Sequence, residues 1–144
     1  MHESVLIELG KWIKKEYIQG KSVLELGSRN VNGSIRGYIE HLGASSYTGV
    51  DFVDGPGVDL VADVCEFKPS IQYDVVISTE MLEHVENWKL AIKTIKETCK
   101  INGLVILTTR APGMIYHGYP HDYWRFTKRE YDIPLMFSIK ATRT

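Results

Sequence analysis

The N-terminal stretch of the chain carries apolar residues at helical spacing, with lysines and a glutamate between them. These apolar residues are Val5, Leu6, Leu9, Trp12, Ile13 and Tyr17. They fall on one face of a helix, so the pattern predicts an amphipathic helix over residues 1–19 that packs on the core. Gln19-Gly20 ends it, because glycine is common just past helix ends.

Short apolar runs then alternate with stretches of helical periodicity. The runs, at residues 22–26, 47–51, 59–63, 73–78 and 104–108, predict strands, and the periodic stretches around 35–42 and 88–99 predict helices. Strands with little polar alternation, interleaved with helices, are typical of a parallel sheet covered on both faces. The predicted fold is an α/β fold of Rossmann type: an open, mostly parallel sheet of about five strands.

No repeat, charge block or low-complexity tract divides the 144 residues. We therefore expect one domain over residues 1–144, with the helix 1–19, a binding core 20–109, and a loop and short tail 110–144 rich in His and aromatic residues. A single core suits a chain of this length.

Composition narrows the function classes. Lys and Arg number 17 against 18 Asp and Glu, for a net charge of −1. No broad positive field results, so nucleic-acid binding is disfavoured. Two cysteines do not make a disulfide framework or a Cys-rich zinc site, and no apolar run approaches the ~20 residues of a membrane span. We expect a cytoplasmic protein.

The first strand and the turn after it form the clearest candidate binding feature. In open α/β sheets, ligands bind beyond the carboxyl ends of the strands. Gly27 lacks a Cβ, so a ligand can approach the backbone there, and the N–H groups at the head of the next helix suit an anionic group. Taken alone, this pattern fits a dinucleotide site, an adenosyl site or a tight turn.

Two carboxylates follow at the same sheet edge. Asp51 closes the second strand, where an acid can accept hydrogen bonds from both ribose hydroxyls, and Asp63 follows the third. The interval from Gly27 to Gly33 departs from the G-x-G-x-x-G fingerprint of dinucleotide-binding proteins. Each acid alone is equally consistent with a solvated strand end.

Four segments in this order carry a family resemblance. They are Val-Leu-Glu-Leu-Gly-Ser (23–28), Tyr-Thr-Gly-Val-Asp (47–51), Ala-Asp-Val (62–64) and the run 73–85 that ends in Glu-His-Val. The chain resembles class I S-adenosylmethionine-dependent methyltransferases, and among these the type 11 group, over about residues 20–127. That family has the strand order 3-2-1-4-5-7-6, with its last two strands in a C-terminal hairpin.

The resemblance implies S-adenosylmethionine as the cofactor and a role for each matching residue. Glu25, Gly27, Ser28 and Arg29 would surround the methionine part, Asp51 would hold the ribose, Phe52, Asp63 and Val64 the adenine, and Ser78 and Thr79 would line the sulfonium side. Arg29 stands where the family usually has a second glycine, which alters the turn or the contact with the cofactor's carboxylate. Asn102-Gly103 replaces the usual Pro-Gly-Gly turn and can still turn the chain.

Two segments offer catalytic candidates, and both also have structural interpretations. Glu80, Glu83 and His84 follow the fourth strand. Glu83 and His84 cap or brace the loop, or His84 or Glu80 faces the acceptor; the spacing is not H-E-x-x-H and offers no third ligand, so no metal site is expected. His121 lies in a segment crowded with His and aromatic residues, where it can act as a general base or simply pack over the sheet edge. Cys65 and Cys99 are interpreted as structural.

The expected activity is methyl transfer to an unidentified acceptor, most simply a small molecule. A shortened, non-catalytic binding module of the same fold is the alternative, favoured by Arg29 and the short C-terminus; a nicotinamide-dependent dehydrogenase shares Asp51 but lacks the glycine spacing. Only residues 137–141 are suited to a sixth strand, so the closing hairpin is expected to be missing or incomplete. The edge of the fifth strand should then be covered by the tail or by a second copy of the chain in a homodimer.

Overall fold

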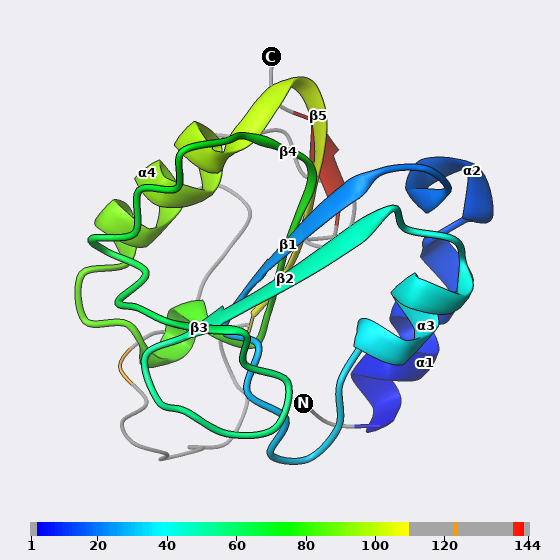
Figure 1. The fold of residues 1–144 in the computed structure, drawn as a ribbon. Helices are drawn as coiled ribbons and strands as arrows, with labels where there is room; N and C mark the ends of the chain where they lie inside the picture. Colours follow the sequence, from blue (N-terminus) through cyan, green and yellow to red (C-terminus); the bar gives the residue numbers. More distant parts are fainter. Residues whose placement is uncertain (1–2, 110–122, 124–139, 143–144) are drawn as a thin grey trace.

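The computed structural model describes residues 3–109, 123 and 140–142. In these residues a sheet of six strands lies between two layers of helices (Figure 1). The elements are, in chain order, α1 (Glu3–Trp12), α2 (Lys15–Ile18), β1 (Ser22–Leu26), α3 (Arg36–His41), β2 (Ser46–Asp51), β3 (Leu60–Val61), β4 (Tyr73–Thr79), the 3-10 helix η1 (Leu82–His84), α4 (Trp88–Thr98), β5 (Cys99–Thr108) and β6 (Lys140–Thr142).

The strand order is β3-β2-β1-β4-β5-β6. Strands β1 to β5 are parallel, and β6 pairs antiparallel with β5. This is the predicted open α/β fold of Rossmann type. The chain adds β2 and β3 on one side of β1, and then β4 and β5 on the other. Strand order therefore reverses beside β1, and sheets of this kind bind ligands at such a point.

Each face of the sheet has its own apolar core. Helix α4 covers one face, where it packs with Leu24, Leu26 and Val76, and helices α1 to α3 cover the other, around Val23 and Ile77 (Figure 1). Because successive side chains of a strand point to opposite faces, a strand covered on both sides needs an unbroken apolar run. This explains why β1 and β4 show no polar alternation.

The helix predicted over residues 1–19 is instead two helices, and that prediction is wrong. Lys14 is extended (φ −90°, ψ 153°) and separates α1 from α2. Ile18 follows Leu9 by nine residues, so at ~100° per residue a continuous helix would turn Ile18 away from the core. The break brings Ile18 into the core, and both side chains are 0% exposed.

Two strands differ from their expected lengths. β3 has only two residues, and Leu60 and Val61 are both exposed. β5 starts directly after α4, and the turn predicted at Asn102-Gly103 is an irregularity within it, with Asn102 at φ +63°. Tyr73 of β4 pairs with Cys99, whereas Val75 pairs with Leu104, so the extra β5 residues bulge out of register.

The tail of the same chain covers the outer edge of β5. Leu104, Val105 and Ile106 pair with Thr142, Ala141 and Lys140 of β6. This is one of the two covers expected from the sequence. The other expected cover, a homodimer, is not supported, because this stretch of the edge is already paired. None of the helices in the described part of the chain is long and apolar enough to cross a membrane.

Substitution by alanine should change the free energy of unfolding in opposite directions at Gly103 and at Gly10. A Cβ on Gly103 would lie 2.6 Å from Cys99 Sγ and 2.7 Å from the Lys100 carbonyl oxygen, whereas one on Gly10 would meet no atom within 4 Å. We expect Gly103→Ala to lower the free energy of unfolding by about 1–3 kcal/mol. Gly10→Ala, inside α1, should raise it by about 0.5–1 kcal/mol. Urea unfolding of both variants checks this, and equal effects would contradict it.

Candidate functional site

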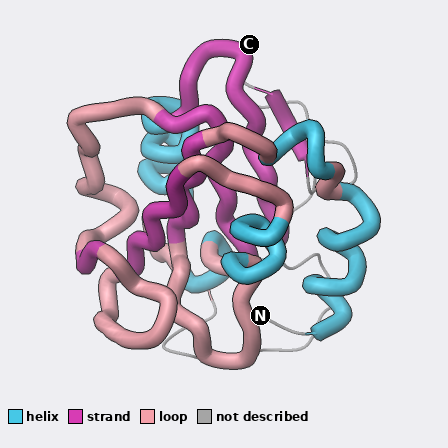
Figure 2. The backbone as a smooth tube through the Cα atoms, turned by 45° about the vertical axis from the view of Figure 1, so that its right-hand side comes forward, coloured by secondary structure: helices cyan, strands magenta, loops and turns pink. Residues whose placement is uncertain are grey.

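A cavity of about 650 Å³ opens at the carboxyl ends of the parallel strands. Figure 2 shows the loops that follow these strands collected at the lower end of the sheet. The cavity is lined from four places in the chain: residues 25–33 at the end of β1, 50–53 at the end of β2, 62–65 after β3, and 79–87 after β4. It therefore lies across the point where strand order reverses.

The loop after β1 is fixed to the end of β2 by backbone hydrogen bonds. The N–H groups of Gly27 and Ser28 both donate to the Val50 carbonyl oxygen, at 2.8 and 3.1 Å. The next N–H, that of Arg29, donates to Asp51 Oδ2 at 3.0 Å. Gly27 has φ +83°, a conformation that other residues adopt at a cost.

The backbone of Gly27 is approached closely by Met81, which lies in the loop after β4 (residues 80–87, the β4 loop). A Cβ on Gly27 would lie 2.8 Å from both Met81 Cβ and Cγ. The sequence suggested that the missing Cβ leaves room for a ligand. The structure shows that it leaves room for a side chain that itself lines the cavity.

Glu25 brings a carboxyl group to the cavity from the buried side of β1. It lines the cavity but is only 2% exposed. The Tyr47 hydroxyl donates to Glu25 Oε2 at 2.5 Å. Burial raises the pKa of Glu25 to about 7, although Tyr47 and Arg36 act in the opposite direction. The group is therefore poised to gain or lose a proton near neutral pH.

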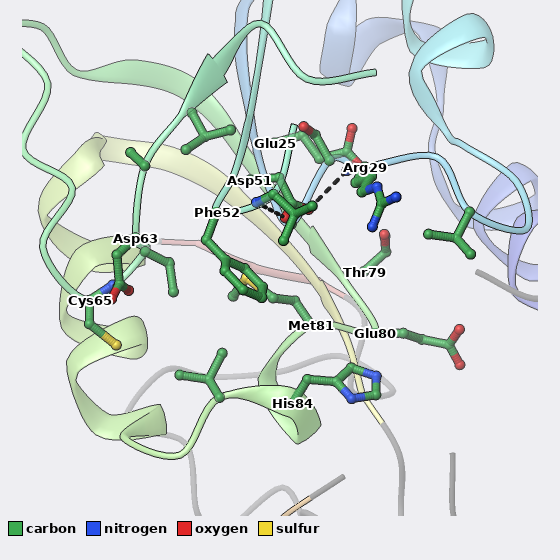
Figure 3. Close-up of a pocket in the computed structure, with 18 of the residues that line it drawn as sticks. Glu25, Arg29, Asp51, Phe52, Asp63, Cys65, Thr79, Glu80, Met81 and His84 are labelled. Carbon is green, nitrogen blue, oxygen red and sulfur yellow. Dashed lines mark hydrogen bonds between the residues drawn. The ribbon is translucent and has the colours of Figure 1, made fainter. Parts of the chain in front are cut away.

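The cavity has two chemically different ends (Figure 3). At one end lie Asp63 and Cys65, where Asp63 Oδ1 accepts the Cys65 N–H at 2.8 Å. At the other end lie Arg29 and Glu80, with Asp51 between the two ends. The lining thus offers acidic groups along its length and one guanidinium near one end.

The β4 loop is tied to the end of β5. Glu80 has φ +48°, and its N–H donates to the Thr108 carbonyl oxygen at 2.9 Å. Thr109 Oγ1 donates to Glu83 Oε2 at 2.9 Å, and the Tyr123 N–H donates to the Glu83 carbonyl oxygen at 2.7 Å. Glu83 is fully buried, which raises its pKa. These contacts hold the next residue, His84, at the cavity wall.

The structure brings most of the predicted site residues together. The residues that line the cavity are Glu25, Gly27, Ser28, Arg29, Asp51, Phe52, Asp63, Val64, Thr79, Glu80 and His84. Ser78 does not line it: it is 1% exposed and, as the neighbour of Thr79 in β4, points to the opposite face. His121 lies outside the described residues.

Sequence reasoning assigned no site role to several lining residues. The β4 loop contributes Met81, Val85, Glu86 and Asn87. The loop after β1 (residues 27–35, the β1 loop) contributes Val31, Asn32 and Gly33. Met81 and Val85 lie within the recognised run 73–85, and the others follow a recognised segment within a few residues; this nearness was the only available signal. Cys65 was interpreted as structural but lines the cavity, whereas Cys99 is buried as expected; neither forms a disulfide bond in the described part of the chain.

An open α/β sheet with a cavity at the point where strand order reverses is typical of folds that bind nucleotides and related cofactors. Comparison of sequences specifies the family: a profile described as a methyltransferase domain matches residues 6–140. The chain belongs to this family. The class I S-adenosylmethionine-dependent methyltransferase resemblance is thereby confirmed, and the type 11 subgroup stays a prediction. A search among curated protein sequences gives no match.

Solved structures share the fold at low sequence identity. A Burkholderia thailandensis 1,6-didemethyltoxoflavin-N1-methyltransferase, solved with 1,6-didemethyltoxoflavin and S-adenosylhomocysteine, has a TM-score of 0.69 and 18% identity over 99% of this chain and 79% of its own. An S-adenosylmethionine-dependent methyltransferase from Mesorhizobium loti has a TM-score of 0.59 and 20% identity over 74% of this chain. The match spans about half, 53%, of the Mesorhizobium protein.

Gly27→Ala should be destabilising because of Met81. The new Cβ would crowd Met81 Cβ and Cγ at 2.8 Å in a residue with φ +83°. We expect a loss of about 1–3 kcal/mol in the free energy of unfolding. The same change in a Met81→Ala background should cost less, because the crowding is gone. Gly37→Ala, with nothing within 4 Å, is the control. Equal costs with and without Met81 would show that the contact is irrelevant.

Proposed function

We propose that this chain binds S-adenosylmethionine in the cavity and transfers its methyl group to a small-molecule acceptor. The observation that carries the proposal is the convergence of the implied cofactor residues, all but Ser78, on one cavity from four separate segments. A volume of about 650 Å³ falls in the range of cofactor sites.

The two ends of the cavity suit the two ends of this elongated cofactor. Asp63 and the Val64 backbone would hold the adenine beside Phe52, and Asp51 would hold the ribose hydroxyls. Arg29 would meet the carboxylate of the amino-acid end, with Glu25 near its ammonium group. No ion pair to the Arg29 guanidinium is formed within the described part of the chain, so its charge is available to an anion.

The chain's own task in such a reaction is mainly alignment. When bound, the cofactor supplies a methyl group on a positively charged sulfur, which is a good leaving group. Thr79, Glu80 and His84 line the wall where the acceptor would approach, and the loop that carries them is fixed to β5. Holding the acceptor in line and excluding water supplies much of the acceleration. The role of His121 as a base, like a cytoplasmic location, stays a prediction.

A small acceptor is supported by the Burkholderia methyltransferase, whose structure holds 1,6-didemethyltoxoflavin beside S-adenosylhomocysteine. The net charge of −1 gives no support for a nucleic-acid acceptor. The chemical identity of the acceptor is a question for a screen of small hydroxyl and amine compounds.

Calorimetric titration with S-adenosylhomocysteine tests the proposed cofactor. We expect binding of this ligand and none of NAD, because the loop after β1 lacks the dinucleotide glycine spacing. Methyl transfer in an acceptor screen with labelled S-adenosylmethionine would follow. Folded protein that binds neither ligand would refute the proposal. Cofactor binding with no transfer to any acceptor would favour the non-catalytic binding module.

Arg29→Ala should lower the affinity only for ligands that carry a carboxylate. A charge-assisted hydrogen bond contributes about 1.5–3 kcal/mol, so affinity for S-adenosylhomocysteine should fall about tenfold to a hundredfold. Binding of 5′-methylthioadenosine, which has no amino-acid end, should stay within about twofold by the same reasoning. Arg29→Lys is the matched control and should retain part of the affinity. An equal loss for both ligands would assign Arg29 to the turn instead.

A further inference from the structure

Tyr47 does not line the cavity but contacts Glu25, a residue that does. It lies on β2, on the same face of the sheet as Glu25 of β1, and it is not among the residues that line the cavity. Its hydroxyl donates to Glu25 Oε2 at 2.5 Å. Glu25 itself lines the cavity and is 2% exposed. A ligand in the cavity would therefore meet Glu25 and not Tyr47.

Charged residues hold the Tyr47 ring from the outer side. The Arg36 guanidinium lies 4.9 Å from the centre of the ring, at a distance typical of cation–π contact. Arg36 is fixed by ion pairs of 2.7 Å to Glu40 and to Asp59. Asp59 Oδ2 also accepts the Gly49 N–H at 2.7 Å, which ties the group to β2. The orientation of the hydroxyl toward Glu25 is thus set by several contacts.

The electrostatics of Glu25 depend on this arrangement. Burial raises its pKa to about 7; the Tyr47 hydrogen bond and Arg36 lower the pKa, and Asp51 raises it. The pKa of Tyr47 is itself raised by burial and by Glu25, so its hydroxyl keeps its proton and acts as a donor. Without that donor, the buried carboxyl group would hold its proton to higher pH.

We propose that Tyr47 is a positioning residue that holds the Glu25 carboxylate toward a cationic group of the ligand, the ammonium at the amino-acid end of S-adenosylmethionine. The inference rests on the proposed function and adds how one end of the ligand is recognised. A buried carboxylate attracts a cation strongly only if it is ionised and fixed in orientation. Tyr47 supplies both conditions from a position that the ligand does not touch.

Tyr47→Phe separates this role from general stability. At pH 7 we expect affinity for S-adenosylhomocysteine to fall about fivefold to tenfold, since without the Tyr47 donor more of Glu25 is protonated and its carboxylate is less well oriented. Binding of 5′-methylthioadenosine, which lacks the ammonium group, should be unchanged. The ionised form of Glu25 binds the cation, so the loss should shrink as the pH rises above 7 and grow below it. Tyr38→Phe is the matched control, because in the described residues its hydroxyl donates to the Gly10 and Ile13 carbonyl oxygens and not to Glu25.

Arg36→Gln gives a second, independent test at a surface position. The substitution removes the cation above the Tyr47 ring. We expect a smaller fall in affinity than for Tyr47→Phe, about twofold to threefold, and again for S-adenosylhomocysteine alone. The role of Tyr47 would be overturned if a variant lost affinity equally for S-adenosylhomocysteine and 5′-methylthioadenosine. It would also be overturned if neither Tyr47→Phe nor Arg36→Gln changed the affinity for S-adenosylhomocysteine. If the unchanged protein binds no S-adenosylhomocysteine, the proposed function itself fails, and the inference fails with it.

Discussion

The site depends on how closely two backbone loops approach each other at the end of the sheet. The Val50 carbonyl oxygen accepts two N–H groups of the β1 loop, and the Asn30 N–H donates to the Pro56 carbonyl oxygen at 2.7 Å. A Cβ on Gly57 would lie 2.7 Å from the Ser28 carbonyl oxygen, and one on Gly49 would lie 2.3 Å from that of Gly57. Side chains larger than hydrogen would force the loops apart. With the loops in contact, Asp51 is brought to the Arg29 backbone and both line one wall.

Glu25 shows that this region is not built for stability alone. A carboxyl group buried in an apolar sheet costs desolvation energy, and a hydrocarbon side chain of similar size commonly serves stability better. Its pKa of about 7 makes its charge responsive to a nearby ligand. Strongly shifted carboxyl groups in cavities are characteristic of functional sites. Here the cost is offset by Tyr47, which in turn is held by Arg36.

Much of the fold and site could be predicted because strand periodicity and strand ends are local features. The apolar run of β1 was predicted at its observed bounds, and Asp51 and Asp63 reach one cavity because parallel strands end at one edge. The break at Lys14 was missed because only tertiary burial of Ile18 requires it. Tyr47 was missed because its contact with Glu25 depends on cross-strand register, which no spacing within one segment reveals.

The two ends of the sheet satisfy their polar groups differently. At the amino end, Asp74 accepts the N–H and hydroxyl of Ser22 at 2.9 and 3.0 Å and pairs with Lys100, and these contacts lower its pKa to about 2. At the carboxyl end lie the buried side-chain atoms that have no partner in the described residues, Ser28 Oγ, Ser78 Oγ and Glu83 Oε1. Protein interiors normally satisfy such atoms. Of these three residues only Ser28 lines the cavity. The amino end therefore satisfies the polar groups of Asp74 and Ser22 with each other and with Lys100, whereas the carboxyl end leaves some of its buried polar atoms without a hydrogen bond in the described residues.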